Sequence, residues 1–114
     1  MLTASPKVLD RTFTALADPT RRAILVQLAG GETTVGELAR PFKISAPAIS
    51  RHLRVLEKAR LISRRRDGSH LRCSLVSQPL RDAAGWLDFY RRFWSDSFDQ
   101  LDEHLKSSIP KEKP

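Results

Sequence analysis

The sequence predicts a mainly α-helical fold that carries one small β-hairpin. Apolar residues recur at helical spacing in several segments between residues 8 and 60, and again from 80 to 106. Between these regions, Asp67-Gly68 separates two short strand-like runs, which is typical of a hairpin. With 114 residues, of which 40% are hydrophobic, the chain can bury one ordinary core. We therefore expect a single domain over residues 1–114.

Two helices are predicted, one before and one after Asp18-Pro19. Helical spacing over residues 8–17 predicts the first, with the apolar positions Val8, Leu9, Thr12, Phe13 and Leu16. Asp18 is expected to cap the second helix, and Pro19 suits its first position because proline has no N–H to satisfy. The apolar stripe of this second helix consists of Ile24, Leu25 and Leu28. Residues 30–31, both glycine, are expected to end it.

A helix-turn-helix is predicted over about residues 34–60. Thr34 and Glu37 form a capping box, in which Glu37 reaches back to the backbone of Thr34, for a short helix ending at about Pro41. Ser45 is expected to cap the next helix, whose apolar positions are Ile49, Leu53, Val55 and Leu56. The open side near its start holds Ala46, Pro47, Ser50, Arg51 and Arg54. Small residues let a helix approach base edges, and serine and arginine supply hydrogen-bond donors there.

A basic hairpin is predicted directly after this helix, over residues 61–76. If residues 67–68 form the whole turn, the cross-strand pairs are Arg66 with Ser69, Arg64 with Leu71, and Ile62 with Cys73. The inner face then holds Ile62, Leu71, Cys73 and Leu75, with Arg64 and Arg66 nearer the tip, beyond the core. The outer face holds Ser63, Arg65, His70, Arg72 and Ser74. Such a hairpin after a helix-turn-helix is the wing of a winged helix.

One long helix is predicted over residues 80–106. Its seam alternates steps of four and three along Leu80, Ala84, Leu87, Arg91, Trp94, Phe98, Leu101 and Leu105. About 27 helical residues would span roughly 40 Å, more than so small a domain covers with its own core. We expect the surplus to pack on a second subunit, with packing inside one chain as the alternative. Residues 107–114 are expected to be a disordered tail.

The positive charge is concentrated in one segment. The whole chain has a formal charge of +7, and residues 51–72 hold eight basic and two acidic residues, a net of +6. A localised basic footprint favours a phosphate-bearing partner, and a solvated charged face is the alternative. The residues expected to supply most of the affinity are Arg51, Arg54, Arg64, Arg65 and Arg66.

Four stretches resemble the arsenic-repressor (ArsR) family of bacterial winged-helix regulators. They are FTALADPTRRAIL at 13–25, ISAPAISRHLRVL at 44–56, LI followed by RRDG within 61–68, and WLDFYRRFW at 86–94. The last resembles the final dimer helix of a metal-free branch of the family. The resemblance implies a homodimeric DNA-binding transcriptional regulator, usually a repressor, that dimerises through its N- and C-terminal helices. The residues expected in the dimer interface are Phe13, Leu87, Tyr90, Arg91, Trp94, Phe98, Leu101 and Leu105.

The resemblance also implies which residues meet double-stranded DNA. Those expected to face the major groove are Ser45, Ala46, Pro47, Ser50 and Arg51. Those expected at the phosphates or the adjoining minor groove are Arg54, Arg66, Ser69 and His70. Arg21 and Arg22 stay open between contact with the DNA backbone and a solvated or salt-bridged role. His52 stays open between contact with DNA and packing at the edge of its helix.

The sequence predicts no metal site, no cofactor and no catalysis. Metal-sensing members of the family carry paired cysteines on the third helix, where residues 37–42 of this chain hold none. The string Asp102-Glu103-His104 matches only half of the family's other metal site. Neither a phosphate-cradling glycine loop nor a His–Cys or His–Ser pairing is evident. Cys73 is expected to be a buried structural thiol, with redox sensing as the alternative.

The expected location is the cytoplasm. A lone cysteine favours a reducing compartment, no run approaches the roughly 20 apolar residues of a membrane span, and the first six residues lack the pattern of a secretory signal. Two rival functions stay open. One is a protein-interaction module that uses the same fold. The other is a repressor that senses oxidation at Cys73 or a small apolar effector at the dimer interface.

Overall fold

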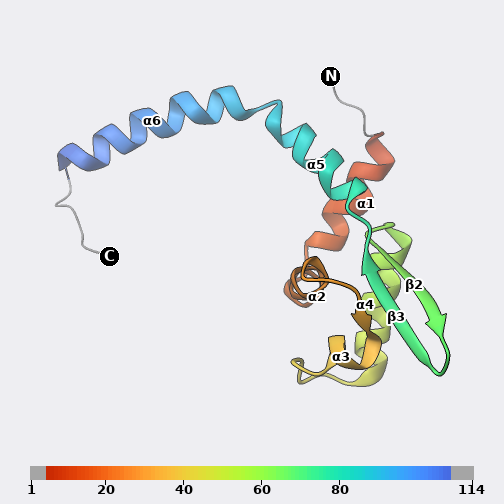
Figure 1. Cartoon of the computed structure of the whole chain (residues 1–114). Coiled ribbons are helices and arrows are strands. Elements are labelled where there is room, and N and C mark those ends of the chain that lie inside the picture. Colours follow the sequence, from red (N-terminus) through yellow and green to blue (C-terminus); the bar gives the residue numbers. More distant parts are fainter. Residues whose placement is uncertain (1–4, 109–114) are drawn as a thin grey trace.

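The computed structural model describes residues 5–108, and all their side chains except those of residues 94–99 and 106–108. Its elements are α1 (Pro6–Leu16), α2 (Pro19–Ala29), β1 (Thr33–Thr34), α3 (Val35–Ala39), α4 (Ala46–Lys58), β2 (Ile62–Asp67), β3 (His70–Leu75), α5 (Gln78–Asp88) and α6 (Arg91–Ser108). In Figure 1, α4 lies beside the β2–β3 hairpin, α5 lies against α1, and α6 extends away from the rest. The predicted mainly helical fold with a small hairpin is confirmed.

Four helices begin at a residue whose side chain caps them. The capping oxygens of Ser5, Asp18, Thr34 and Ser45 each accept a backbone N–H three residues further on, at 3.0–3.2 Å. These bonds satisfy donors that an α-helix leaves without partners at its start. The predicted caps at Asp18, Thr34 and Ser45 are confirmed. Glu37 does not complete the predicted capping box, because its carboxylate pairs with Arg40 at 2.6 Å.

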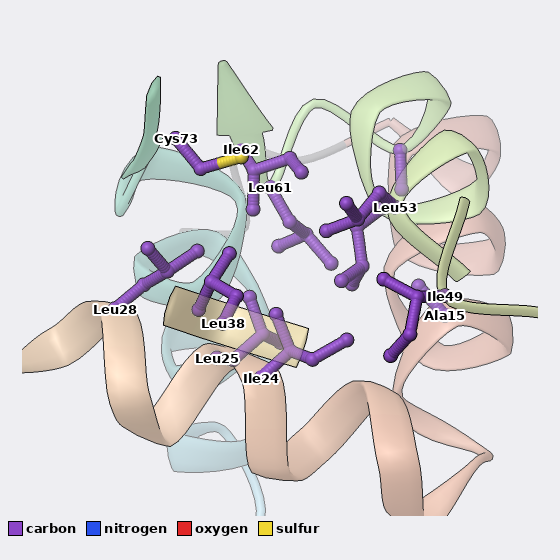
Figure 2. Packing of buried hydrophobic residues seen from close by; sticks show 12 residues of the cluster. Ala15, Ile24, Leu25, Leu28, Leu38, Ile49, Leu53, Leu61, Ile62 and Cys73 are labelled. Atoms are coloured by element: carbon purple, nitrogen blue, oxygen red, sulfur yellow. The ribbon is translucent and has the colours of Figure 1, made fainter. Parts of the chain in front are cut away.

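The core is built around the inner face of α4. Its buried side chains come from α1, α2, α3, α4 and the hairpin, and include Ala15, Ile24, Leu25, Leu28, Leu38, Ile49, Leu53, Leu56, Leu61, Ile62 and Cys73. Figure 2 labels all of these except Leu56, and the labelled side chains point toward one another from separate elements. Thr12 is also buried, and its hydroxyl donates to the carbonyl of Val8 at 2.9 Å, so burial leaves no unpaired group there.

The hairpin turn is placed one residue later than predicted. Asp67 pairs with His70, so Gly68 and Ser69 are the two central residues of the turn. Gly68 has a φ of 65°, and a positive φ at the first central position is the arrangement of a type II′ turn. The register therefore shifts by two residues, which keeps every side chain on its predicted face. It also moves Arg64 from beside Leu71 to a position opposite Cys73.

The sheet has a third strand that the sequence did not predict. The two-residue strand β1 pairs antiparallel with β3, with Thr33 opposite Cys73, and the strand order is β1-β3-β2. Two residues carry too little alternation to signal a strand. The pairing ties the start of α3 to the wing, because Thr34 both ends β1 and caps α3.

The turn between α3 and α4 is longer than predicted. Helix α3 ends at Ala39, not at about Pro41, which leaves residues 40–45 as the connection. The N–H groups of Arg40 and Phe42 bond to carbonyls three residues back, at 3.3 and 3.0 Å. Between them, Pro41 has no N–H to continue the helical pattern, so the helix stops before it.

The end of α4 turns directly into the wing. The N–H of Leu61 bonds to the carbonyl of Leu56, and that of Arg60 to the carbonyl of Glu57, both at 3.0 Å. This pair of bonds is a Schellman motif, which requires a left-handed residue just past the helix. Arg60 occupies that position with a φ of 61°, where glycine is usual. The chain thus reverses within a few residues and enters β2 at Ile62.

The predicted single helix over 80–106 is wrong in one respect, since two helices fill the region. Helix α5 ends at Asp88 and α6 begins at Arg91. The N–H groups of Phe89 and Tyr90 bond to carbonyls three residues back, at 3.2 and 3.0 Å, so the α-helical ladder is interrupted there. The first two residues of the predicted tail, 107 and 108, belong to α6, and residues 109–114 lie outside the described range. Within residues 5–108, no helix is both long and apolar enough to cross a membrane.

Truncating a core side chain of α4 should destabilise the fold. Leu53→Ala removes a fully buried side chain, and we expect the free energy of unfolding to fall by about 2–5 kcal/mol. The matched control is Val26→Ala on α2, whose side chain is 73% exposed, and whose effect should stay within about 0.5 kcal/mol. Urea denaturation followed by circular dichroism measures both. Equal losses for the two variants would contradict this core.

Candidate nucleic-acid interface

The start of α4 presents an open surface of small and basic residues. All six residues predicted here are exposed: Ser45, Ala46, Pro47, Ser50, Arg51 and Arg54. They lie on this side because Ile49, Leu53 and Leu56 turn the opposite face of the helix into the core. Within the described part of the chain, Arg51 and Arg54 make no ion pair. Their guanidinium groups are therefore available to an anionic partner.

Three polar side chains brace α4 against the first two helices. The guanidinium of Arg21 donates to the carbonyls of Ala15 and Thr14, at 2.7 and 3.1 Å, near the end of α1. One of its nitrogens also lies 3.3 Å from Nδ1 of His52 on α4. That ring nitrogen is 3.8 Å from the carboxylate of Asp18. Arg21 and His52 thus make contacts within the protein, and for His52 this agrees with packing at the edge of its helix.

Arg22 has a similar place. Its guanidinium donates to the carbonyl of Leu16 at 2.7 Å, at the last residue of α1. The negative end of the helix dipole also favours a cation at this position. Arg21 and Arg22 together close the end of α1, so both basic groups at the start of α2 are engaged within the fold.

The wing has two exposed arginines near its tip, Arg65 and Arg66. Arg66, Ser69 and His70 are all exposed, as predicted from the sequence. Arg66 makes no ion pair among the described side chains. Its neighbour Arg65 is 58% exposed, but donates to a carboxylate oxygen of Glu32 at 2.8 Å. The tip therefore offers one unpaired guanidinium and one that already has an acidic partner.

The sequence predicted that Arg64 lies near the wing tip, beyond the core, and this is wrong. Arg64 stands opposite the buried Cys73, and its side chain is 22% exposed. Two of its nitrogens donate to the same oxygen of Glu57 on α4, at 2.6 and 3.2 Å. This hydrogen bond lowers the pKa of Glu57 and raises the pKa of Arg64, so both groups hold their charges. The new position follows from the two-residue shift in the hairpin register.

Cys73 is fully buried in the core, as predicted. Burial raises the pKa of its thiol, which disfavours the reactive thiolate. The absence of a metal site stays a prediction. Among the side chains that the structure describes, no three of His, Cys, Asp and Glu come together in a way that could hold a metal ion.

The C-terminal helices leave apolar side chains uncovered in the single chain. Phe13 of α1 packs edge-on against Trp86 of α5, with ring centroids 5.8 Å apart, and Trp86 packs in turn against Tyr90 at 5.1 Å. Phe89 also packs edge-on against Tyr90, at 5.1 Å, yet is 58% exposed. Beyond this cluster, Phe93, Leu101 and Leu105 are 42–69% exposed. Leu87 and Tyr90 are half-buried, and Arg91 pairs with Asp88 at 3.2 Å. The side chains of Trp94 and Phe98, also predicted in the interface, lie outside those described.

Three acidic partners of the wing were missed in the sequence. Glu57 holds Arg64, Glu32 holds Arg65, and Asp67 accepts from Arg72 at 3.1 Å. Asp67 could have been found, because it lies close to Arg72 across the turn. Glu32 could not, since it joins the wing only through the unpredicted pairing of β1 with β3.

A short helix, a turn, an exposed small-and-basic helix and a β-hairpin define a winged helix-turn-helix regulator. Residues 18–64 match the sequence pattern of the bacterial regulatory proteins of the arsR family. The chain belongs to this family, whose members are transcriptional regulators and not enzymes.

The relatives cover most of the described chain. The transcriptional repressor SdpR of Bacillus subtilis is 43% identical over 79 residues, which are 69% of this chain and 88% of that protein. The transcriptional regulator Rv2034 of Mycobacterium tuberculosis is 46% identical over 75% of this chain and 78% of its own length. Among solved structures, an ArsR family transcriptional regulator, RHA00566, superposes with a TM-score of 0.75 at 35% identity, covering 82% of this chain and 96% of its own.

Replacing Asp18 should reveal the contribution of its charge to stability. The backbone N–H of Arg21 lowers the pKa of Asp18, so the charged cap stabilises the fold above the pKa of an unfolded Asp, about 3.9, and the gain is lost as the pH falls through the folded pKa. Asp18→Ala should cost about 1 kcal/mol at neutral pH.

Asp18→Asn is the matched control, because asparagine caps helices about as well but does not titrate. Urea denaturation over a series of pH values compares the variants. The stability difference between wild type and Asp18→Asn should shrink toward low pH, and a difference that stays constant would contradict the assignment.

Proposed function

We propose that this chain represses transcription by binding a pseudo-palindromic DNA operator as a homodimer. The observation that carries the proposal is the open start of α4, where six small, polar or basic residues are exposed and Arg51 and Arg54 have no described ion pair. An exposed helix start of this composition suits the major groove, because nothing bulky keeps the helix from the base edges. Such a regulator acts on chromosomal DNA, so its location would be the cytoplasm.

The proposed contacts divide between reading bases and holding phosphates. Base contacts fall to the start of α4, at Ser45, Ala46, Pro47, Ser50 and Arg51. Phosphate contacts fall to Arg54, Arg65, Arg66, Ser69 and His70. Ser45 would act through its position at the helix start, since its hydroxyl already accepts the N–H of Ala48. Arg65 would have to exchange Glu32 for a phosphate.

The uncovered apolar side chains support the homodimer. Phe93 is 69% exposed and Leu101 49%, on a helix that Figure 1 shows extending away from the rest of the chain. Full burial of an exposed side chain of this size is worth roughly 1.5–3 kcal/mol, and the same helix of a second copy would gain the part of it that corresponds to their exposed surface. A twofold dimer would present two α4 helices to two half-sites about one helical turn of DNA apart.

Two arginine variants should separate base contacts from phosphate contacts. Arg51→Ala should weaken binding to an operator duplex by about 5- to 150-fold for each half-site while changing random-duplex binding less, because one base contact is worth about 1–3 kcal/mol. Arg66→Gln should weaken both duplexes and lower the slope of log affinity against log salt by about 0.9 for each subunit, or about 1.8 for the dimer. Fluorescence anisotropy measures both, with an operator selected by the wild-type protein from a random duplex pool.

Arg81→Gln on α5 is the control, since this exposed cation lies outside the proposed contacts and should leave affinity and slope unchanged. Equal losses for Arg51→Ala on operator and random DNA would contradict the assigned division. A wild-type protein that binds both duplexes equally would contradict sequence-specific binding itself.

A charged side chain on α6 should break the dimer. Phe93→Glu and Leu101→Glu should each shift the protein from dimer to monomer in sedimentation velocity and weaken operator binding by more than about tenfold, because a half-site binder loses the second set of contacts. Val26→Glu, on the 73% exposed side chain of α2, is the control and should stay dimeric. A monomeric wild type, or dimeric α6 variants, would count against this interface.

A further inference from the structure

Arg64 stands apart from the other arginines of the wing. It lies on the inner face of β2, opposite the buried Cys73, whereas Arg65 lies on the outer face and Arg66 near the tip. Two of its nitrogens donate to one oxygen of Glu57, whose side chain is 41% exposed. Glu57 belongs to the last turn of α4, so the contact joins the recognition helix to the wing.

A role for Arg64 as a phosphate contact conflicts with this geometry. Moving the guanidinium to DNA would break two charge-assisted hydrogen bonds, which are among the stronger polar contacts in proteins. It would also leave the Glu57 carboxylate unpaired close to the phosphates, where its charge repels them. Arg66 has no such partner among the described side chains and can meet a phosphate without this loss.

The contact gives the wing a second point of attachment to α4. The first is the short turn at its base, where Leu61 bonds back to Leu56 and Val76 bonds to Leu61. Arg64 lies three residues further along β2, about 10 Å at the usual rise of a strand. The pairing of β1 with β3 holds the other strand of the wing, and two attachments separated along β2 then restrain the angle between the wing and α4.

We propose that Arg64 is a positioning residue, which fastens the wing to the last turn of α4 through Glu57 so that the wing tip and the start of α4 reach one duplex together. The proposal rests on the proposed function, because the duplex is what both elements are aligned to meet. It differs from the sequence-based expectation in that the arginine contributes through geometry and not through its own contact with DNA.

The Glu57→Gln variant tests the proposal through the direction in which operator affinity changes. Removing a negative charge near DNA should tighten binding if electrostatics alone acts, and would also release Arg64 to a phosphate. The positioning role predicts the opposite, a loss of operator affinity of about tenfold. The salt slope should stay unchanged, because the wing tip still meets the same phosphates once binding has ordered it, and the loss is the cost of that ordering. Arg64→Lys should behave alike, since lysine keeps the charge but cannot make the two-nitrogen contact.

Glu32→Gln is the matched control. It removes an equal charge from the outer face of the wing, frees Arg65 and leaves Arg72 with Asp67 alone, so it should tighten binding. Thermal melts by circular dichroism establish that each variant is folded at the assay temperature. If Glu57→Gln is not folded there, Arg64→Lys takes its place as the test variant. The proposal is overturned if Glu57→Gln binds the operator as well as wild type or better, or if Arg64→Gln lowers the salt slope as Arg66→Gln does.

A measurement without DNA keeps this proposal separate from the proposed function. Backbone ¹⁵N relaxation should give wing amides of residues 64–72 that are as ordered as those of α4 in the wild type, and less ordered in Glu57→Gln. Equal order in both proteins would overturn the positioning role. A wild-type protein that binds the operator and a random duplex equally well would instead overturn the proposed function.

Discussion

The fold depends on helix α4, which has one face buried in the core and the other exposed to solvent. Leu53 and Leu56 on one face are fully buried in the core, while Arg51 and Arg54 on the other stand in solvent. Because protein interiors are close-packed, the helix cannot roll or tilt without opening voids around its buried leucines. The core therefore fixes the direction in which the exposed face points. Ser45, which caps the helix, sets where that face begins.

The wing is less strongly charged than its sequence suggests. Segment 51–72 carries a net charge of +6, yet three of its arginines are held by carboxylates. One carboxylate, that of Glu32, comes from outside the segment and is brought to the wing by the pairing of β1 with β3. Among the basic residues of segment 51–72, those left without an ion pair to a described side chain are Arg51, Arg54, Lys58, Arg60 and Arg66. The freely available positive charge is thus centred on α4 and its junction with the wing, with one residue near the tip.

The features that the sequence predicted correctly depend on residues close together in the chain. The caps at Asp18, Thr34 and Ser45 each involve a donor three residues away, and the two faces of the hairpin follow from alternation alone. The errors involve longer distances or competing local bonds. The register depended on whether Asp67 or Gly68 opens the turn, and Arg64 took its partner from another element. The break between α5 and α6 arises where three-residue bonds at Phe89 and Tyr90 replace the helical pattern, which the apolar spacing does not reveal.

The break at residues 89–90 separates two properties that a continuous helix would have tied together. Helix α5 is anchored to the body through Trp86 and Phe13, whereas the direction of α6 is set by the backbone angles of two residues. In a dimer assembled through α6, those angles determine how far apart and at what relative rotation the two bodies stand. Substitutions at this joint would then change the spacing between the proposed half-sites, while the side chains proposed to contact the bases stay the same.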